Sequence, residues 1–230
     1  MRIYILVEGR RTEAKVYPAW LSHIIPRLQR IRAYDENADN SYFLLSAEGY
    51  PSIYEDLVNA VQDVNAAGNY DYLMVCLDSD EASIEERHAE VDEVLVENQV
   101  RLHNAQLVII VQNRCIETWF LGNRRVVRKN PHSPVLRGYL QHYNVMVDDP
   151  ELMGLHPAFT RHAQFHASYI KEIFQERQLH YSKKFPGPVL EGAFLDQLRR
   201  RVAREPTHLA SLRTLLQFLD DLNACLDGGV

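Results

Sequence analysis

Cysteine is scarce in this chain of 230 residues, which contains only Cys76, Cys115 and Cys225. Their number is odd, and none of their spacings matches a CxxC pair or a metal-binding pattern. The sequence therefore gives no sign of a disulfide framework or of a cysteine-based zinc site. We expect a reducing compartment, with the cytoplasm as the location. Cys76 lies inside an apolar run, so we expect it in the core.

Long hydrophobic runs are also lacking. No apolar segment approaches the roughly 20 residues that span a membrane, so we expect no membrane association. Met1 and Arg2 lead directly into the short run from Ile3 to Val7, and we therefore expect no secretory signal peptide. The pattern GxxxxGK[S/T] does not occur, which excludes a P-loop NTPase.

The chain has no excess of positive charge. Its net charge is −6, which by itself argues against a general nucleic-acid-binding protein. The distribution is uneven, however: residues 1–110 carry 9 Lys+Arg and 19 Asp+Glu (9 − 19 = −10), and residues 111–230 carry 16 and 12 (16 − 12 = +4). An acidic half joined to a mildly basic half suits a metal site beside a polyanion-binding surface.

Alternating strands and helices are the main pattern that is present. The composition, with 46% hydrophobic and 24% charged residues, is ordinary for a globular protein. We predict strands at 2–7, 42–46, 72–77 and 107–111, and helices at 13–30, 52–67 and 83–98. The run from Tyr72 to Leu77 is unbroken, as in central strands of parallel sheets. This alternation predicts an α/β fold with a mainly parallel, doubly wound sheet flanked by helices.

The second half of the chain has a different character. Prolines at 131, 134, 150 and 157 divide it into short pieces, and helices are expected at 159–178, 189–204 and 208–226. We therefore predict two domains: an α/β domain at 1–125 and a mainly helical C-terminal lobe at 126–230 that packs on the sheet.

Acidic residues follow three of the predicted strands. The central strand runs into Asp78 and Asp80, Glu8 follows the first strand, and Glu117 comes just beyond the fourth. The carboxyl ends of parallel strands meet at one edge of a sheet, where ligands bind. Neighbouring carboxylates repel each other unless a cation offsets their charge, and oxygen ligands suit Mg²⁺ or Mn²⁺. The alternative for Asp78 and Asp80 is a solvated strand end that caps the next helix.

Two groups of basic residues lie close to these acids in the sequence. The candidate nucleic-acid-binding residues are Arg10, Arg11 and Lys15 after Glu8, and Arg124, Arg125, Arg128 and Lys129 after Glu117. Ordinary surface charge is the alternative interpretation for both groups. We interpret Lys183 and Lys184, and the arginines at 199–201 and 204, as solvated surface. His162 and His166 lack a third ligand nearby, so we do not assign them to a metal.

Three short motifs together resemble a known family. The segment Val7-Glu8-Gly9-Arg10-Arg11-Thr12-Glu13, the triplet Asp78-Ser79-Asp80 and the segment Glu117-Thr118-Trp119-Phe120-Leu121 occur in this order. They resemble Toprim domains, most of all the small stand-alone OLD-like and RloB-like Toprim proteins of defence or mobile-element systems. The resemblance covers roughly residues 1–125 and implies a Toprim-like (Rossmann-like) sheet. It also implies Glu8 as general acid/base, Asp78 and Asp80 as metal ligands, and Glu117 as an additional OLD-type ligand.

The resemblance implies a Mg²⁺- or Mn²⁺-dependent nuclease that hydrolyses phosphodiester bonds of DNA or RNA. No topoisomerase domain is evident, so hydrolysis is favoured over strand transfer. An ABC/AAA-type ATPase partner and a role in phage defence belong to the same expectation. The alternative is a non-catalytic Toprim-like subunit that binds nucleic acid or a partner. A receiver domain and a metal-dependent glycosyltransferase fit less well, because the first lacks its acidic pair after the first strand and the second gives Glu8 and Gly9 no role.

Overall fold

The computed structural model describes residues 1–228 and divides them into two compact units. Unit 1 comprises 1–77, 84–111 and the chain from 217 onward, and unit 2 comprises 78–83 and 112–216. The chain crosses between them within two strands, because Leu77 and Val111 belong to unit 1 and the residues after them to unit 2. The predicted domains, 1–125 and 126–230, are each continuous in the sequence, whereas the two units are not. Residues 78–83 and 112–125 belong to unit 2, and the chain from 217 onward belongs to unit 1.

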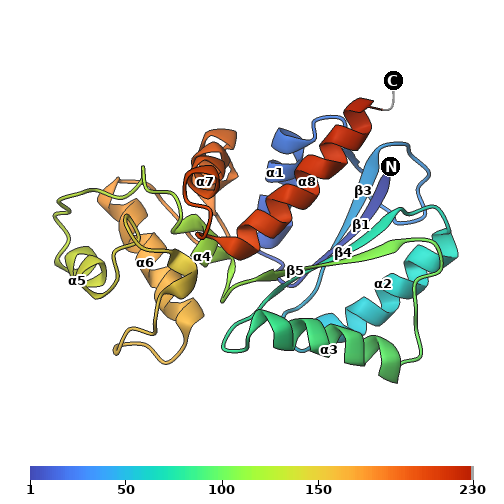
Figure 1. Cartoon of the computed structure of the whole chain (residues 1–230), viewed down its shortest axis with the longest axis horizontal. Helices are drawn as coiled ribbons and strands as arrows, with labels where there is room; N and C mark the ends of the chain where they lie inside the picture. The colour runs from blue at the N-terminus through green and yellow to red at the C-terminus, as the bar shows by residue number, and fades with distance from the viewer. Residues whose placement is uncertain (229–230) are drawn as a thin grey trace. The chain divides into compact units, whose positions relative to one another are not determined.

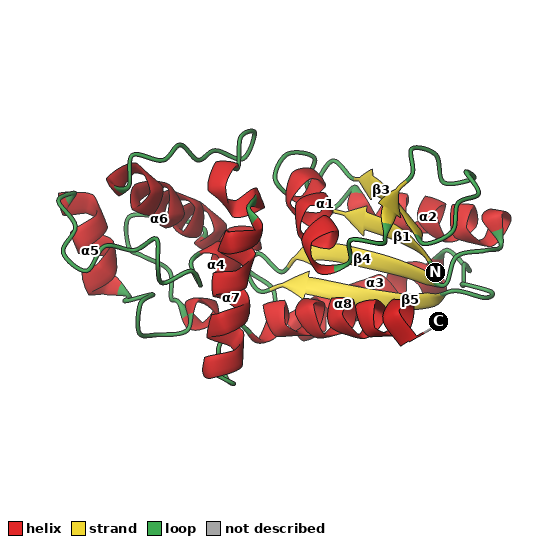
Figure 2. Cartoon of the chain, turned by 90° about the horizontal axis from the view of Figure 1, so that it is seen from above, coloured by secondary structure: helices red, strands yellow, loops and turns green. Residues whose placement is uncertain are grey.

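The sheet has five strands, all parallel, in the order β2-β3-β1-β4-β5. Figure 2 shows β3, β1, β4 and β5 side by side in this order. The strands are β1 (Arg2–Val7), β2 (Gln29–Arg30), β3 (Ser41–Ser46), β4 (Tyr72–Asp78) and β5 (Gln106–Gln112). The α/β class and the parallel sheet are therefore confirmed, and so are the four predicted strands. The short edge strand β2 was not predicted, because its two exposed polar residues carry no apolar pattern.

Three helices connect these strands: α1 (Glu13–Ile24), α2 (Ile53–Ala67) and α3 (Ile84–Glu97). The prediction that the first helix continues to about residue 30 is wrong. Ile25 precedes Pro26, and a residue before proline is disfavoured in the helical conformation, so α1 ends there. Gly68 ends α2 in the left-handed conformation at φ 69°, which glycine adopts without steric cost at the end of a helix.

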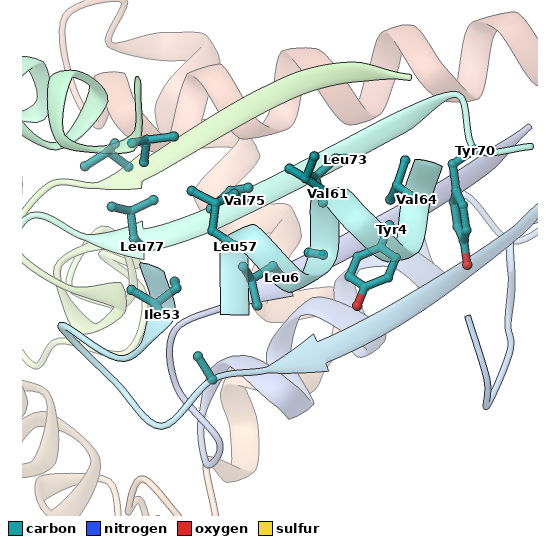
Figure 3. Packing of buried hydrophobic residues seen from close by; sticks show 14 residues of the cluster. Tyr4, Leu6, Ile53, Leu57, Val61, Val64, Tyr70, Leu73, Val75 and Leu77 are labelled. Atoms are coloured by element: carbon teal, nitrogen blue, oxygen red, sulfur yellow. The ribbon is translucent and has the colours of Figure 1, made fainter. Parts of the chain in front are cut away.

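Alternate residues of the strands build the core of unit 1. Figure 3 shows Tyr4 and Leu6 of β1 and Leu73 of β4 on the side of the sheet that carries α2. From α2, the residues Ile53, Leu57, Val61 and Val64 pack against them. The helices α2 and α3 cover this face, while α1 and the second part of α8 lie on the opposite face (Figure 1). Because side chains alternate along a strand, each central strand is buried on both sides.

Unit 2 is mainly helical, which confirms a C-terminal helical region. It contains α4 (Ile116–Phe120), α5 (Pro134–His142), α6 (His162–Glu176), α7 (Gly192–Arg204), the first part of α8 (Ala210–Gly228), and the 3₁₀ turns η1 (Pro150–Leu152) and η2 (Gly187–Leu190). The helices predicted at 159–178, 189–204 and 208–226 correspond to α6, α7 and α8. Within residues 1–228, no helix combines the length and the hydropathy that crossing a membrane requires.

Candidate functional site

The turn from β1 to α1 positions Glu8 in unit 1. Val7 pairs with Cys76 of β4, and the Glu8 amide donates a hydrogen bond of 3.0 Å to the Cys76 carbonyl. Glu8 therefore leaves the sheet at the carboxyl end of β1, with a half-buried side chain. A Cβ atom on Gly9 would collide with the carboxylate of Glu13, so glycine permits this acid to fold against the turn. The buried Glu13 was not predicted as a site residue, although it belongs to the segment that carries the resemblance.

The strand order gives the end of β1 a special place in the sheet. From β1 the chain moves outward to β2 and β3, and then returns to the other side of β1 to form β4. The order of the sheet thus reverses between β1 and β4. In open α/β sheets, ligands bind at such a switch point, outside the carboxyl ends of the strands. Glu8 directly follows β1, and Asp78 is the last residue of β4.

In unit 2, the turn after β4 is fixed to the turn after β5. The amide of Ser79 donates to the Gln112 carbonyl at 2.9 Å, and the amide of Asp80 donates to the Arg114 carbonyl at 2.9 Å. In return, the Arg114 amide donates to Ser79 Oγ at 2.8 Å, and its Nη1 donates to the Asp80 carbonyl at 2.9 Å. Asp80 and Arg114 both take the left-handed conformation, with φ of 50° and 66°. Such backbone conformations cluster at functional sites, and here the hydrogen bonds hold them in place.

Glu81, the next acid of this turn, is engaged by the start of α6. The amide of His162 donates to Glu81 Oε1 at 2.9 Å, and Nδ1 of the same residue lies 2.6 Å from Oε2. Burial alone would raise the pKa of Glu81, but the hydrogen bonds and the charge of His162 outweigh it and lower this pKa. Glu81 therefore acts as a carboxylate cap for α6, which separates it in role from Asp78 and Asp80.

Glu117 is fully buried in α4. Its Oε1 accepts a 3.0 Å hydrogen bond from the Tyr181 hydroxyl and lies 3.8 Å from Lys183 Nζ. Its Oε2 is buried, and no donor reaches it within residues 1–228. A buried carboxylate oxygen without a donor carries a desolvation cost, which a bound cation or an acidic hydrogen would offset.

The negative charges of Glu117 and Asp78 both affect the thiol of Cys115. Burial raises its pKa well above the ordinary value, and the negative charges of Glu117 and Asp78 raise it further. Asp78 and Glu117 therefore both act on the surroundings of Cys115. This residue was not predicted to belong to the site. Its effect depends on the fold, because the sequence separates it from Asp78 by 37 positions (115 − 78 = 37).

His166 of α6 contacts Thr118, the residue that follows Glu117 in α4. Its Nδ1 is 2.7 Å from Oγ1 of Thr118, and its side chain is fully buried. Burial, together with the nearby charges of His162 and Arg114, lowers the pKa of His166 to about 3, so the ring is neutral at physiological pH. His162 and His166 thus have different partners, Glu81 and Thr118.

The donor set fits a magnesium-type cation better than a closed metal centre. Within the described part of the chain, no group of three or more His, Cys, Asp or Glu side chains is arranged around a common metal position. Mg²⁺ is usually held by one or two carboxylates together with water and substrate phosphates. Asp78 and Asp80 are two such carboxylates in the sequence, and their role as ligands stays a prediction. The role of Glu117 as an additional ligand stays a prediction.

Some of the predicted nucleic-acid-binding residues form ion pairs, and others are exposed. Arg10 is paired with Glu48, while Arg11 and Lys15 are exposed. In unit 2, Arg124 donates to Glu205 at 2.9 Å and Arg128 lies 3.9 Å from Glu176, whereas Arg125 and Lys129 are exposed.

One interpretation of the basic residues is wrong. Arg201 was taken as solvated surface, but only 4% of it is exposed. Its guanidinium group donates to the carbonyls of Gly122, Val145 and Asp148 at 3.2, 2.8 and 2.6 Å. Trp119 and Phe120, which follow Glu117 in α4, are fully buried.

Comparison of the chain with protein-family models, with curated proteins and with solved structures finds no significant match in any of the three. The function is therefore argued from the residues and the fold of this chain.

Proposed function

We propose that this protein is a Mg²⁺- or Mn²⁺-dependent nuclease with a Toprim-like site. One observation carries the proposal: the neighbouring parallel strands β1 and β4 flank the switch point of the sheet, and an acidic residue stands at the carboxyl end of each, Glu8 directly after β1 and Asp78 as the last residue of β4. The order of these acids, Glu8 first and Asp78 with Asp80 later, is the order of the Toprim motifs that the sequence resembles.

Each acid has a role in the proposed hydrolysis of a phosphodiester bond. Asp78 and Asp80 would hold the cation, and Arg114 supports this by fixing the turn between them through the Asp80 carbonyl. Glu8 would take up and release the proton during the reaction as general base and acid. When bound, the cation would offset the negative charge of the phosphate and lower the pKa of a coordinated water.

The proposed substrate is DNA or RNA, held by basic residues outside the acidic turn. Arg11, Lys15, Arg125 and Lys129 are exposed and can contact backbone phosphates. The proposal includes a cytoplasmic location and action in phage defence with an ABC/AAA-type ATPase partner. The alternative proposal is that this protein is a non-catalytic subunit that binds nucleic acid or a partner through the same residues.

The direct test is a cleavage assay with purified protein. Plasmid, linear DNA and RNA, including tRNA, are incubated with Mg²⁺, Mn²⁺ or EDTA. We expect metal-dependent cleavage. Glu8→Gln should reduce it by a factor on the order of 10²–10⁴, as loss of an acid–base group does, and Asp78→Asn should abolish it by removing a ligand of the cation. The matched controls are Asp92→Asn and Glu93→Gln, which neutralise exposed acids of α3 and should cut normally.

Cleavage that survives both site substitutions contradicts the proposed chemistry. If the wild-type protein cuts none of the substrates but binds them, the non-catalytic alternative is supported. Adding a candidate ATPase with ATP then decides whether activity requires a partner, because Asp78→Asn should remove any activity that appears.

A further inference from the structure

A pocket of about 110 Å³ lies in unit 2, along one face of α7. Gln197, Arg200, Arg201 and Arg204 of this helix line it, and they recur at intervals of three and four residues. Residues at this spacing share one face of a helix. The pattern therefore places three guanidinium groups along a single pocket. No acidic residue lines the pocket, and none of the residues of the proposed acidic site does so.

The opposite wall is the loop after α4, with Gly122, Arg124 and Arg125 (α4 and α7 are seen in Figure 2). A Cβ atom on Gly122 would lie only 2.8 Å from the Trp119 carbonyl and 3.1 Å from a methyl group of Leu198. Glycine thus permits the loop to approach α7 closely. Arg201 ties the two walls together by donating to the Gly122 carbonyl at 3.2 Å.

The pocket holds far more positive charge than its neighbours offset. Of its five arginines, Arg124 is paired with Glu205, and Arg201 is occupied by backbone carbonyls. The side chains of Arg125, Arg200 and Arg204 have no hydrogen-bond or ion-pair partner among the described residues, and all three are exposed. Such a concentration of like charge is unfavourable by itself and attracts an anion.

Two further observations concern the two inner arginines of the pocket, Arg124 and Arg201. The Nε atoms of Arg124 and Arg201 are buried, and neither has an acceptor within residues 1–228. Burial lowers the pKa of Arg201 to about 10, and the nearby charge of Arg124 contributes to this decrease. An anion in the pocket would offset the repulsion between these two guanidinium groups.

We infer that this pocket binds a phosphate group. A guanidinium group presents parallel N–H donors that match the oxygens of phosphate, and arginine is preferred where phosphate is recognised in this way. A single water molecule needs roughly 10–15 Å³ of such space, so the pocket has room for a tetrahedral phosphate. The phosphate belongs to a nucleic-acid backbone, to a nucleic-acid end, or to a free ion. The pocket shares Arg125 with the nucleic-acid-binding residues of the proposed function, but binding of phosphate does not require cleavage.

Direct binding measurements in EDTA test this inference. The probes are inorganic phosphate, measured by calorimetry, and two single-stranded oligonucleotides of one sequence with either a 5′-phosphate or a 5′-hydroxyl, measured by fluorescence anisotropy. The variant is Arg200→Gln/Arg204→Gln, which removes two exposed cations of the pocket. Its matched control is Arg161→Gln/Lys171→Gln, which removes the same charge from exposed positions of α6 and its N-cap.

We expect the pocket variant to bind at least about tenfold more weakly, because it loses charge-assisted hydrogen bonds. The control should stay within about twofold, since isolated surface charges contribute little. Tighter binding of the 5′-phosphorylated oligonucleotide would identify a nucleic-acid end, and equal binding of both oligonucleotides a backbone phosphate. Binding of inorganic phosphate alone would identify the free ion. Each of these three outcomes supports the inference.

The inference is overturned if the wild-type protein binds none of the three probes, or if the pocket variant and its control behave alike. Circular dichroism and urea unfolding of both double variants confirm that the fold is retained. Because this binding is measured in EDTA, it does not require metal-dependent cleavage, and Asp92→Asn, at an exposed acid of α3, should leave it unchanged. Failure of the nuclease proposal therefore shows in the cleavage assay only, and failure of the phosphate pocket shows in the binding assay.

Discussion

The two units are stabilised by different kinds of buried contact. The core of unit 1 is a continuous apolar cluster between the sheet and α2, in which strand residues alternate between the two faces (Figure 3). Unit 2 also buries apolar side chains, but it buries more Arg, Asp, Glu and His side chains than unit 1, where Arg2, Glu13 and Arg87 are the buried ones among the described residues. Glu117, Glu151, His166 and Arg201 are each at most 7% exposed.

The start of α8 illustrates how unit 2 uses these groups. Asp149 Oδ1 accepts a hydrogen bond from the Leu209 amide at 3.1 Å, and Glu151 accepts from the hydroxyl of Ser211 at 2.6 Å. The same hydroxyl accepts from Trp119 Nε1 at 2.7 Å. Carboxylates at the N-terminus of a helix satisfy its unpaired amides and interact favourably with its dipole. Segments that are about 60 residues apart in the chain are joined by these bonds.

The difference between the units predicts different responses to mutation. Apolar packing in unit 1 depends on volume and is independent of pH. Buried polar contacts in unit 2 depend on every partner being present, because removal of one leaves another without a hydrogen bond. Three substitutions test this contrast.

The largest effect is expected for Arg201→Met. Methionine fills similar space but leaves the carbonyls of Gly122, Val145 and Asp148 without their donor. We expect the free energy of unfolding to fall by about 3–5 kcal/mol, measured by urea unfolding. The control is Arg200→Met on the same helix, where an exposed side chain should change stability by no more than about 0.5 kcal/mol. A loss below about 1 kcal/mol for Arg201→Met would show that packing, and not these bonds, holds unit 2.

A somewhat smaller effect is expected for Leu57→Ala in unit 1. Leu57 of α2 is fully buried in the apolar cluster, so its truncation should cost about 2–5 kcal/mol of unfolding free energy. Amide hydrogen exchange should show the loss of protection in β1, β4 and α2. Val96→Ala on α3 serves as control, because Val96 is 77% exposed and should lose almost nothing. Equal costs for the two substitutions would contradict the position of the core.

The smallest effect concerns pH and His166 in unit 2. The unfolded chain binds a proton near the ordinary histidine pKa of 6.5, whereas burial lowers this pKa to about 3 in the folded protein. Between these values the unfolded state binds more protons, so stability is complete above pH 6.5 and falls as the pH decreases. At pH 5 the loss should be about 2 kcal/mol relative to pH 8.

Comparison with His166→Gln isolates this contribution. The variant should lack that part of the pH dependence, and His180→Gln, which changes an exposed histidine of the same unit, should retain it. Parallel stability profiles for the wild type and His166→Gln would contradict a buried neutral ring. Unfolding curves between pH 5 and pH 8 provide the measurement.

Local patterns were sufficient for several features. The apolar run that ends at Asp78 predicts a buried strand, and the structure confirms it from Tyr72 to Asp78. The burial of Cys76 follows from the same run. These predictions succeed because a strand or helix in a hydrophobic core requires an apolar pattern in its own residues. The end of α1 was missed, because the effect of Pro26 on the preceding residue was not included in the prediction.

Other features depend on residues that are far apart in the chain. Nothing near Glu81 indicates that it binds His162, and nothing near Arg201 indicates that it reaches the Gly122 carbonyl. The buried Arg201 lies in a charged run that has the composition of a solvated surface. Arg201 is spaced from Gln197 and Arg204 at helical intervals, and this was the only sequence signal for its position. The spacing indicates that the three residues share one face of a helix, but it does not indicate what that face contacts.

The sequence by itself determined the alternation of strands and helices and placed acidic residues directly after β1 and β4. The tertiary structure decided the strand order, which makes β1 and β4 neighbours at the switch point of the sheet. It also decided that Arg124, Arg125, Arg200, Arg201 and Arg204 line one pocket. The physical reason is the range of the interactions: burial of an element shows in its own residues, whereas strand order and buried polar contacts depend on how distant segments pack.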